Sequence, residues 1–484
     1  MKRITLLFLQ LFVCAAIASA AKTGYKIQLK VTDWTDSMVY LVHYYGKSSP
    51  LYITDSARLD KSGNALMKST DSAFVGGIYM LMFSDKKTYF ELLLNAGDDL
   101  SVTATISKLP EGLKYKNSPE NDRFLTYGKF MKTYGEGQAA LKKEYESART
   151  KADTANVRKR SADLAKSMVE YRQNYIKENP GTLLASIFSA MRIPDVPEGD
   201  HFLADGKTKD STFAYRYYKT HYWDGFNFRD DRLIYTPIYD PRLEEYMSKL
   251  VLPWPDSMKM ECDYLLAKAK GTKDMFHYTL AFLSQYAETS KVMGIDEVFV
   301  HLVENYYMKG DAFWLKSEEL EKYIDRGRKI APNVLGNVAP QIKLPNVTTK
   351  KEENMLNMKA KYTLVLFYSP NCGHCQHEMP GIDSLYKAVL KAKGVKIYTV
   401  ATETEDTTIN SFIKKYHMQE WTNTWDPDHT SDYHNKYDVY STPTLYLLDE
   451  KKIIRGKRLD HTNIAGLIEM LEKKEKAQKD KNKS

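Results

Sequence analysis

Two cysteines separated by two residues are the group in this sequence with the clearest chemistry. Cys372-Gly-His-Cys375 follows the apolar run Tyr362–Tyr368, so the pair lies where a buried strand is expected to give way to a helix. At the start of a helix, unpaired backbone N–H groups and the helix dipole stabilise a thiolate. Since the spacing lets two sulfurs close a reversible disulfide, the motif predicts thiol–disulfide exchange.

The two cysteines are predicted to have different tasks. Cys372, at the N-cap or in the first turn, is expected to attack, and Cys375, one turn later and more enclosed, to resolve. Gly373 and His374 lie between them and are candidates for tuning the redox properties of the pair. A protonated His374 would stabilise the Cys372 thiolate and make the disulfide more oxidising. Because nucleophilicity falls with the pKa, its effect on the rate has no fixed sign.

A carboxylate follows the pair on the same predicted helix. Glu378 lies three residues after Cys375 and on the same helix face, so it is a candidate for exchanging a proton with that thiol. The alternative is a solvated acid near the start of the helix, favoured by the dipole. Pro380 within the helix is expected to kink it.

Alternating strands and helices are expected to position these residues. In Thr442-Pro443 the proline stands at the entry of a second apolar run, where a strand tolerates it. This alternation predicts an α/β domain over residues 333–475. Its predicted elements are strands 362–368, 395–401, 444–448 and 453–456, and helices from residue 372, over 407–417 and from residue 463.

The rest of the chain predicts two further domains, so the expected fold is multidomain. Residues 22–107 alternate apolar and polar positions, as in 25–31, and predict an N-terminal antiparallel β domain. Residues 108–332 carry apolar residues at spacings of three and four and predict an all-helical middle domain, with long helices over 124–149 and 151–177. No catalytic group stands out in either.

An aromatic and basic stretch, residues 215–228, interrupts the helical region. Such a segment could grip a client peptide or a glycan at the surface. The interpretation we favour is an aromatic helix edge packed into the core.

The first twenty residues are interpreted as a signal peptide. Lys2 and Arg3 precede an apolar stretch, 4–17, that is too short to span a bilayer, and small residues mark a cleavage site at position 20. We therefore expect export to the periplasm or cell envelope. Lipidation of Cys14 is the alternative, although Val13 stands where a small residue is expected.

The formal net charge of +8 is partly due to basic residues at the two ends of the chain. Residues 476–484 form a lysine-rich tail, which is interpreted as solvated. No basic patch of the kind that binds nucleic acid is found.

The remaining cysteines do not form a disulfide framework. Cys262 lies in a helical pattern and is expected to be a buried structural thiol. Cys372, Cys375 and His377 could bind zinc, but a closed site needs four ligands, and the sequence has no second CxxC or well-spaced histidine pair. A peroxidase motif would need proline at position 365, where the chain has Val365.

Taken together, these motifs resemble the TlpA-like branch of the thioredoxin superfamily, over less than a third of the chain. The residues that carry the resemblance are Ala339-Pro340, Phe367-Tyr-Ser-Pro-Asn371, Cys372-Gly-His-Cys375, Glu378, Pro380, Tyr437-Asp-Val439, Thr442-Pro443-Thr444 and Gly456-Lys457.

The resemblance implies an exported reductase that keeps client cysteines reduced through a mixed disulfide. It implies that Pro443 is cis and faces the cysteines, and that backbone groups at Thr442 pair with the client chain. Electrons would stay on sulfur, so no cofactor is implied, and a separate membrane or periplasmic protein would supply thiols.

Three departures from the family bear on its activity. Asn371 stands where tryptophan is common, which alters the surface that faces the client. Leu366 replaces the buried acid of thioredoxin itself, leaving Glu378 as the candidate proton handler. The Gly373-His374 pair resembles protein disulfide isomerase more than thioredoxin, which bears on the direction of electron flow.

The length of the N-terminal portion leaves a second hypothesis open. The protein could be a non-catalytic envelope binding protein whose thioredoxin-like domain is passive. That hypothesis predicts full function in cells when both cysteines are replaced by serine.

Overall fold

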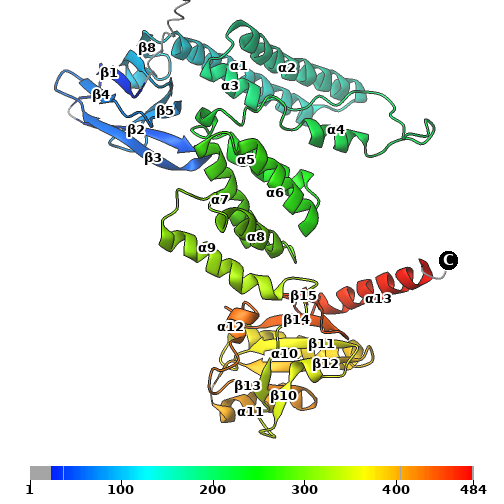
Figure 1. Ribbon diagram of the computed structural model, residues 1–484. Helices are drawn as coiled ribbons and strands as arrows, with labels where there is room; N and C mark the ends of the chain where they lie inside the picture. The colour runs from blue at the N-terminus through cyan, green and yellow to red at the C-terminus, as the bar shows by residue number, and fades with distance from the viewer. Residues whose placement is uncertain (1–22, 36, 404, 482–484) are drawn as a thin grey trace, which may run out of the picture. The chain divides into compact units, whose positions relative to one another are not determined.

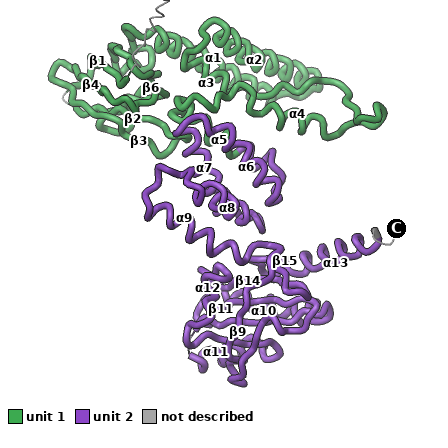
Figure 2. Tube along the Cα trace, in the orientation of Figure 1, with its two compact units in different colours: residues 1–244 green, residues 245–484 purple. Residues whose placement is uncertain are grey.

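The structure is a computed structural model that describes residues 23–35, 37–403 and 405–481. The predicted signal peptide, with Cys14, lies outside the described residues. The chain divides into two compact units, residues 1–244 and 245–484 (Figure 2).

The first unit begins with two four-stranded sheets that enclose one core. Every second side chain of β1 and of the end of β7 is buried in this core, as expected of half-buried strands. The strands pair antiparallel except β1 and β7, which are parallel. In spatial order the sheets are β4 (Asn64–Ser69), β1 (Tyr25–Val31), β7 (Asp98–Ala104), β8 (Leu113–Lys116), and β3 (Lys47–Arg58), β2 (Met38–Tyr45), β5 (Gly77–Phe83), β6 (Tyr89–Leu94).

The β part extends to Lys116, beyond residue 107 where the sequence pattern predicts its end. The short strand β8 buries Leu113 and pairs with β7, a contact too short to leave a clear pattern. Helices then follow: α1 (Pro119–Ser147), α2 (Lys151–Glu178), α3 (Leu183–Ala190), α4 (Phe213–His221) and α5 (Tyr239–Glu245).

The two long helices α1 and α2 lie side by side (Figure 1). A capping box between Thr150 and Asp153 begins α2, and Asn179 is the residue at its end. After α4, the aromatic stretch turns inward, with Tyr222, Trp223 and Phe226 buried. The part of this stretch after α4 is therefore core, whereas its part within α4 has no buried residue.

The second unit begins with helices and ends with the α/β domain. Its first helices are α6 (Pro255–Ala269), α7 (Lys273–Thr289), α8 (Asp296–Leu302) and α9 (Ser317–Ile330). Cys262 of α6 is buried, and burial raises the pKa of its thiol.

A five-stranded mixed sheet forms the centre of the C-terminal domain. The central strand β11 is buried at all seven positions, as expected of a strand covered on both faces. It runs parallel to β12 and antiparallel to β14. In spatial order the strands are β13 (Thr422–Trp425), β12 (Val395–Ala401), β11 (Tyr362–Tyr368), β14 (Thr444–Asp449) and β15 (Ile454–Lys457).

Helices cover both faces of this sheet. Residues of α10 (Gly373–Leu385), α11 (Asp406–Lys415) and α13 (Ile464–Lys481) pack in the core on one face. On the other face lie α12 (Tyr433–Lys436) and residues 336–354, which we call the lead-in segment. This segment includes the hairpin of β9 (Lys343–Pro345) and β10 (Glu352–Asn354).

The lead-in segment also pairs with the outer edge of β15. Gly336 N–H donates to the Ile454 carbonyl, and Ile454 N–H donates to the Asn337 carbonyl, both at 2.9 Å. Ala339 N–H donates to the Lys452 carbonyl at 2.8 Å.

The predicted fold class is confirmed: antiparallel β sheets, a helical middle region and a C-terminal α/β domain. None of the helices in the described ranges combines the length and apolar character needed to cross a bilayer.

Candidate functional site

The first cysteine lies where strand β11 gives way to helix α10. Cys372 is the N-cap residue of that helix and is half-buried. Its Sγ lies 3.1 Å from the carbonyl oxygen of Thr442, to which the thiol donates. The fold therefore brings Thr442 into contact with Cys372, although the two residues are 70 positions apart in the sequence.

Hydrogen bonding favours the ionised form of this thiol. Burial alone would raise the pKa of Cys372, but hydrogen bonds from the Thr442 side chain and from the backbone N–H groups of Cys375 and His374 outweigh it. The net result is a pKa below the ordinary value of 9.0. Thiolate is the nucleophilic form, so Cys372 is suited to attack.

The second cysteine is protected. Cys375 has no exposed surface and packs in the core cluster between α10 and the sheet. Burial raises its pKa to about 11, although the Ser369 backbone N–H works in the opposite direction. The site thus holds one thiol that ionises readily and one that keeps its proton.

The segment before β14 forms the other side of the site. The peptide bond between Thr442 and Pro443 is cis, and Thr444 begins the strand. The predicted residues Cys372, Cys375 and Thr442 are brought together here. Gly373 and His374 are exposed at the first turn of α10.

Glu378 has a partner that sequence reasoning did not find. Its carboxylate accepts the backbone N–H of His461 at 2.6 Å and lies 2.8 Å from Nδ1 of the same residue. The His461 ring also lies against Gly381, where a Cβ atom would come within 2.6 Å of ring carbons. The described contacts of Glu378 are therefore with His461.

A second carboxylate lies close to the site. Ser369 Oγ donates to Glu403 Oε1 at 2.7 Å, and the Asn371 backbone N–H donates to Ser369 Oγ at 3.2 Å. Glu403 follows β12, whose end lies beside the end of β11. No local signal marked this residue, because the contact depends on the pairing of two strands.

A buried ion pair joins the helical region of the second unit to the C-terminal domain. Lys457 of β15 and Asp296 of α8 are both buried and lie 2.5 Å apart. Lys457 Nζ also donates to Asn333 Oδ1 at 2.5 Å. Burial lowers the pKa of Lys457, and Asp296 opposes that shift.

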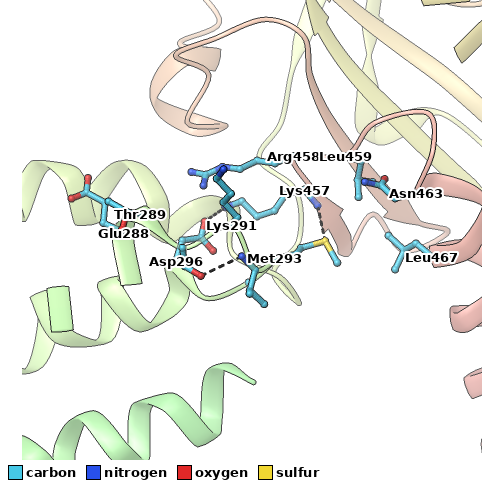
Figure 3. A pocket seen from close by; sticks show the side chains of 13 residues that line it. Glu288, Thr289, Lys291, Met293, Asp296, Lys457, Arg458, Leu459, Asn463 and Leu467 are labelled. Carbon is cyan, nitrogen blue, oxygen red and sulfur yellow. Dashed lines mark hydrogen bonds and ion pairs between the residues drawn. The ribbon is translucent and has the colours of Figure 1, made fainter. Parts of the chain in front are cut away.

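A pocket of about 480 Å³ opens beside this ion pair. Figure 3 shows the loop after α7, with Lys291 and Met293, on one side, and Arg458, Leu459 and Asn463 on the other. Neither Cys372 nor Cys375 lines this pocket.

In the described part of the chain, no three side chains of histidine, cysteine, aspartate or glutamate gather as a metal site would need. His377 is exposed.

Two parts of the chain match known families. Residues 335–457 match the AhpC/TSA family, and residues 166–333 match DUF5106, a domain of unknown function.

Individual relatives match between about a quarter and rather more than half of the chain. The thiol-disulfide oxidoreductase ResA of Bacillus thuringiensis subsp. konkukian is 28% identical over 129 residues, which are 26% of this chain and 72% of that protein. A domain of a possible thiol-disulfide isomerase from Cytophaga hutchinsonii is 35% identical, over 30% of this chain and 99% of that one, with a TM-score of 0.28. A thioredoxin-like protein from Bacteroides caccae is 19% identical, over 57% of this chain and 97% of that one, with a TM-score of 0.45.

Proposed function

The C-terminal domain of this chain belongs to the thioredoxin-like AhpC/TSA family and is homologous to ResA-type thiol–disulfide oxidoreductases, and on this premise we propose that the protein reduces disulfides in client proteins. The observation that carries the proposal is the unequal pair of thiols. Cys372 is accessible with a lowered pKa, and Cys375 is buried with a raised one.

The first step is attack by the Cys372 thiolate on one sulfur of the client disulfide. A bond forms between Cys372 Sγ and that sulfur while the client S–S bond breaks. The electron pair leaves on the other client sulfur, which takes a proton from solvent. We expect backbone groups at Thr442, whose carbonyl oxygen lies 3.1 Å from Cys372 Sγ, to hold the client backbone.

The second step releases the client. Cys375 loses its proton and attacks Cys372 Sγ, forming the Cys372–Cys375 disulfide and expelling the second client sulfur as a thiolate that is then protonated. Two electrons pass from the protein to the client. Because the pKa of Cys375 is about 11, removal of its proton is the demanding part of this step.

Reduction of insulin disulfides by the full chain, with dithiothreitol as electron source, tests the proposal. Cys372→Ala should abolish activity above the dithiothreitol background, and Cys375→Ala should accumulate the mixed disulfide. Cys262→Ala is the matched control, because that thiol is buried away from the site and should leave activity unchanged. Full activity of Cys372→Ala would refute the proposal.

The direction of electron flow is tested by the reduction potential of the pair. Equilibration in graded thiol buffers should give a value near that of thioredoxin, about −270 mV, for a reductase. A value near −180 to −120 mV would instead indicate an oxidase or isomerase, with His374 the first residue to replace.

We further propose that the protein acts in the periplasm or cell envelope and receives electrons from a separate thiol donor. The apolar leader with its two basic residues supports export. Fractionation of cells, with Cys14→Ala as a comparison, tests this: a cytosolic full-length chain would contradict export.

A further inference from the structure

An ion pair joins helix α9 of the helical region to the loop that precedes the cis peptide bond between Thr442 and Pro443. Arg326 binds both carboxylate oxygens of Asp438, and its Nε donates to Glu288 at 2.8 Å. Arg458 reaches the same carboxylate at 3.1 Å, and the Asp438 side chain is buried. Figure 1 shows α9 next to α12, which precedes this loop. The position of the loop therefore depends on α9.

The loop presents an exposed aromatic ring beside the site. Tyr440 is 63% exposed, with the guanidinium carbon of Arg326 at 5.4 Å and Nζ of Lys329 at 5.7 Å from its ring centre. Arg326 is matched by two carboxylates, whereas no acidic partner of Lys329 is found among the described residues. An unmatched cation therefore lies against an exposed ring.

This ring and cation are within reach of a bound client. Tyr440 precedes Thr442 by two residues, so their Cα atoms lie within about 7.6 Å. The Thr442 carbonyl contacts Cys372 Sγ. Since an extended chain advances about 3.3 Å per residue, client residues two or three positions from the attacked cysteine could reach Tyr440 and Lys329.

We propose that Tyr440 and Lys329 form a selectivity surface for client segments that carry a carboxylate two or three residues from the reactive cysteine. Lys329 pairs with the carboxylate, and the Tyr440 ring packs against the adjoining client chain. The inference rests on the proposed function and extends it, because it gives the helical region a part in choosing the substrate.

The test uses reduced full-length protein and peptides with one cysteine as a mixed disulfide with mercaptoethanol. Glutamate, glutamine or lysine is placed two or three residues from that cysteine, on either side. On at least one side the glutamate peptide should react about two- to fivefold faster than the glutamine peptide, and the lysine peptide should be slowest. Lys329→Gln should remove this preference.

Lys322→Gln is the matched control, because it makes the same charge change at an exposed position of α9, two turns earlier. It should keep the preference. Tyr440→Ala should slow the glutamate and glutamine peptides alike. Equal rates for all peptides in the unaltered protein, or an unchanged preference in Lys329→Gln, would overturn the inference.

Hydroxyethyl disulfide separates this inference from the proposed function. It carries no charge and no peptide, so the unaltered protein, Lys329→Gln and Lys322→Gln should reduce it at equal rates. Failure of the unaltered protein to reduce it would overturn the proposed function. A normal rate with this compound and no selectivity among peptides would overturn only the selectivity surface.

Discussion

At the scale of single residues, the site separates two thiols that are chemically identical in the unfolded chain. Cys372 owes its lowered pKa to hydrogen bonds that outweigh burial, and Cys375 owes its raised pKa mainly to burial. A lowered pKa of Cys372 stabilises the reduced form of the pair as pH rises through that pKa toward the ordinary value. Taken alone, this makes the Cys372–Cys375 disulfide more oxidising, so the measured reduction potential decides the direction of electron flow. Protonation of Cys375 up to about pH 11 keeps the pair from being two thiolates.

We predict that iodoacetamide alkylates the two cysteines of the reduced protein at different rates. Mass spectrometry measures the rate for each cysteine as a function of pH. The rate at Cys372 should level off below pH 9.0, whereas Cys375, which has no exposed surface and a pKa raised to about 11, should react far more slowly. Cys262, which is also buried with a raised pKa, should stay unmodified as well. In urea all three should react alike, and equal rates for Cys372 and Cys375 in the folded protein would contradict the prediction.

The sequence was enough to find the two cysteines, because a strand, a turn and a helix start leave a local pattern. It could not supply the partner of Glu378, since His461 lies 83 positions away and meets it only after the chain folds. The proton-exchange role of Glu378 with Cys375 stays a prediction. Glu403 was missed for the same reason as His461: its contact with Ser369 follows from strand order.

At the scale of elements, helix α10 and the segment before α13 fit closely against each other. The His461 ring lies against Gly381 of α10, while Glu378, one turn earlier, accepts two hydrogen bonds from His461. Glycine is needed at position 381 because any side chain would occupy the space of the ring. The presence of Pro380 beside it does not end the helix, which continues to Leu385.

We predict that Gly381→Ala lowers the free energy of unfolding by about 1–3 kcal/mol, because its Cβ would overlap the His461 ring. Urea denaturation measures the change. Gly466→Ala is the control: it lies in α13 with no atom near its added Cβ, and should stabilise by about 0.5–1 kcal/mol through helix propensity. A stabilised Gly381→Ala protein would show that the ring moves freely.

At the scale of the second unit, the helical region and the C-terminal domain share buried charges. Lys457 and Asp296 form one such pair, and Arg326 and Asp438, 112 positions apart, form another. Sequence patterns predicted the helices of the one region and the strands and helices of the other. They did not predict these contacts, because ion pairs between distant segments leave no periodic signal.

Removing one partner of the buried pair should be costly. Lys457→Met leaves Asp296 buried without its cation, so we expect a loss of about 3–5 kcal/mol in the free energy of unfolding. Lys343→Met, which breaks the exposed pair with Glu352, should cost about 1 kcal/mol or less. Calorimetry or urea titration compares them, and equal effects would mean that the buried pair contributes no more than a surface one.

The pairing of the lead-in segment with β15 has a practical consequence for truncated versions of the protein. Residues 336–339 pair with the backbone of Ile454, where that strand begins, and with the carbonyl of Lys452 just before it. A recombinant fragment that starts after residue 339 would leave this edge open, and an open strand edge is a template for self-association. Fragments of the C-terminal domain made for crystallisation or spectroscopy should therefore begin before Gly336.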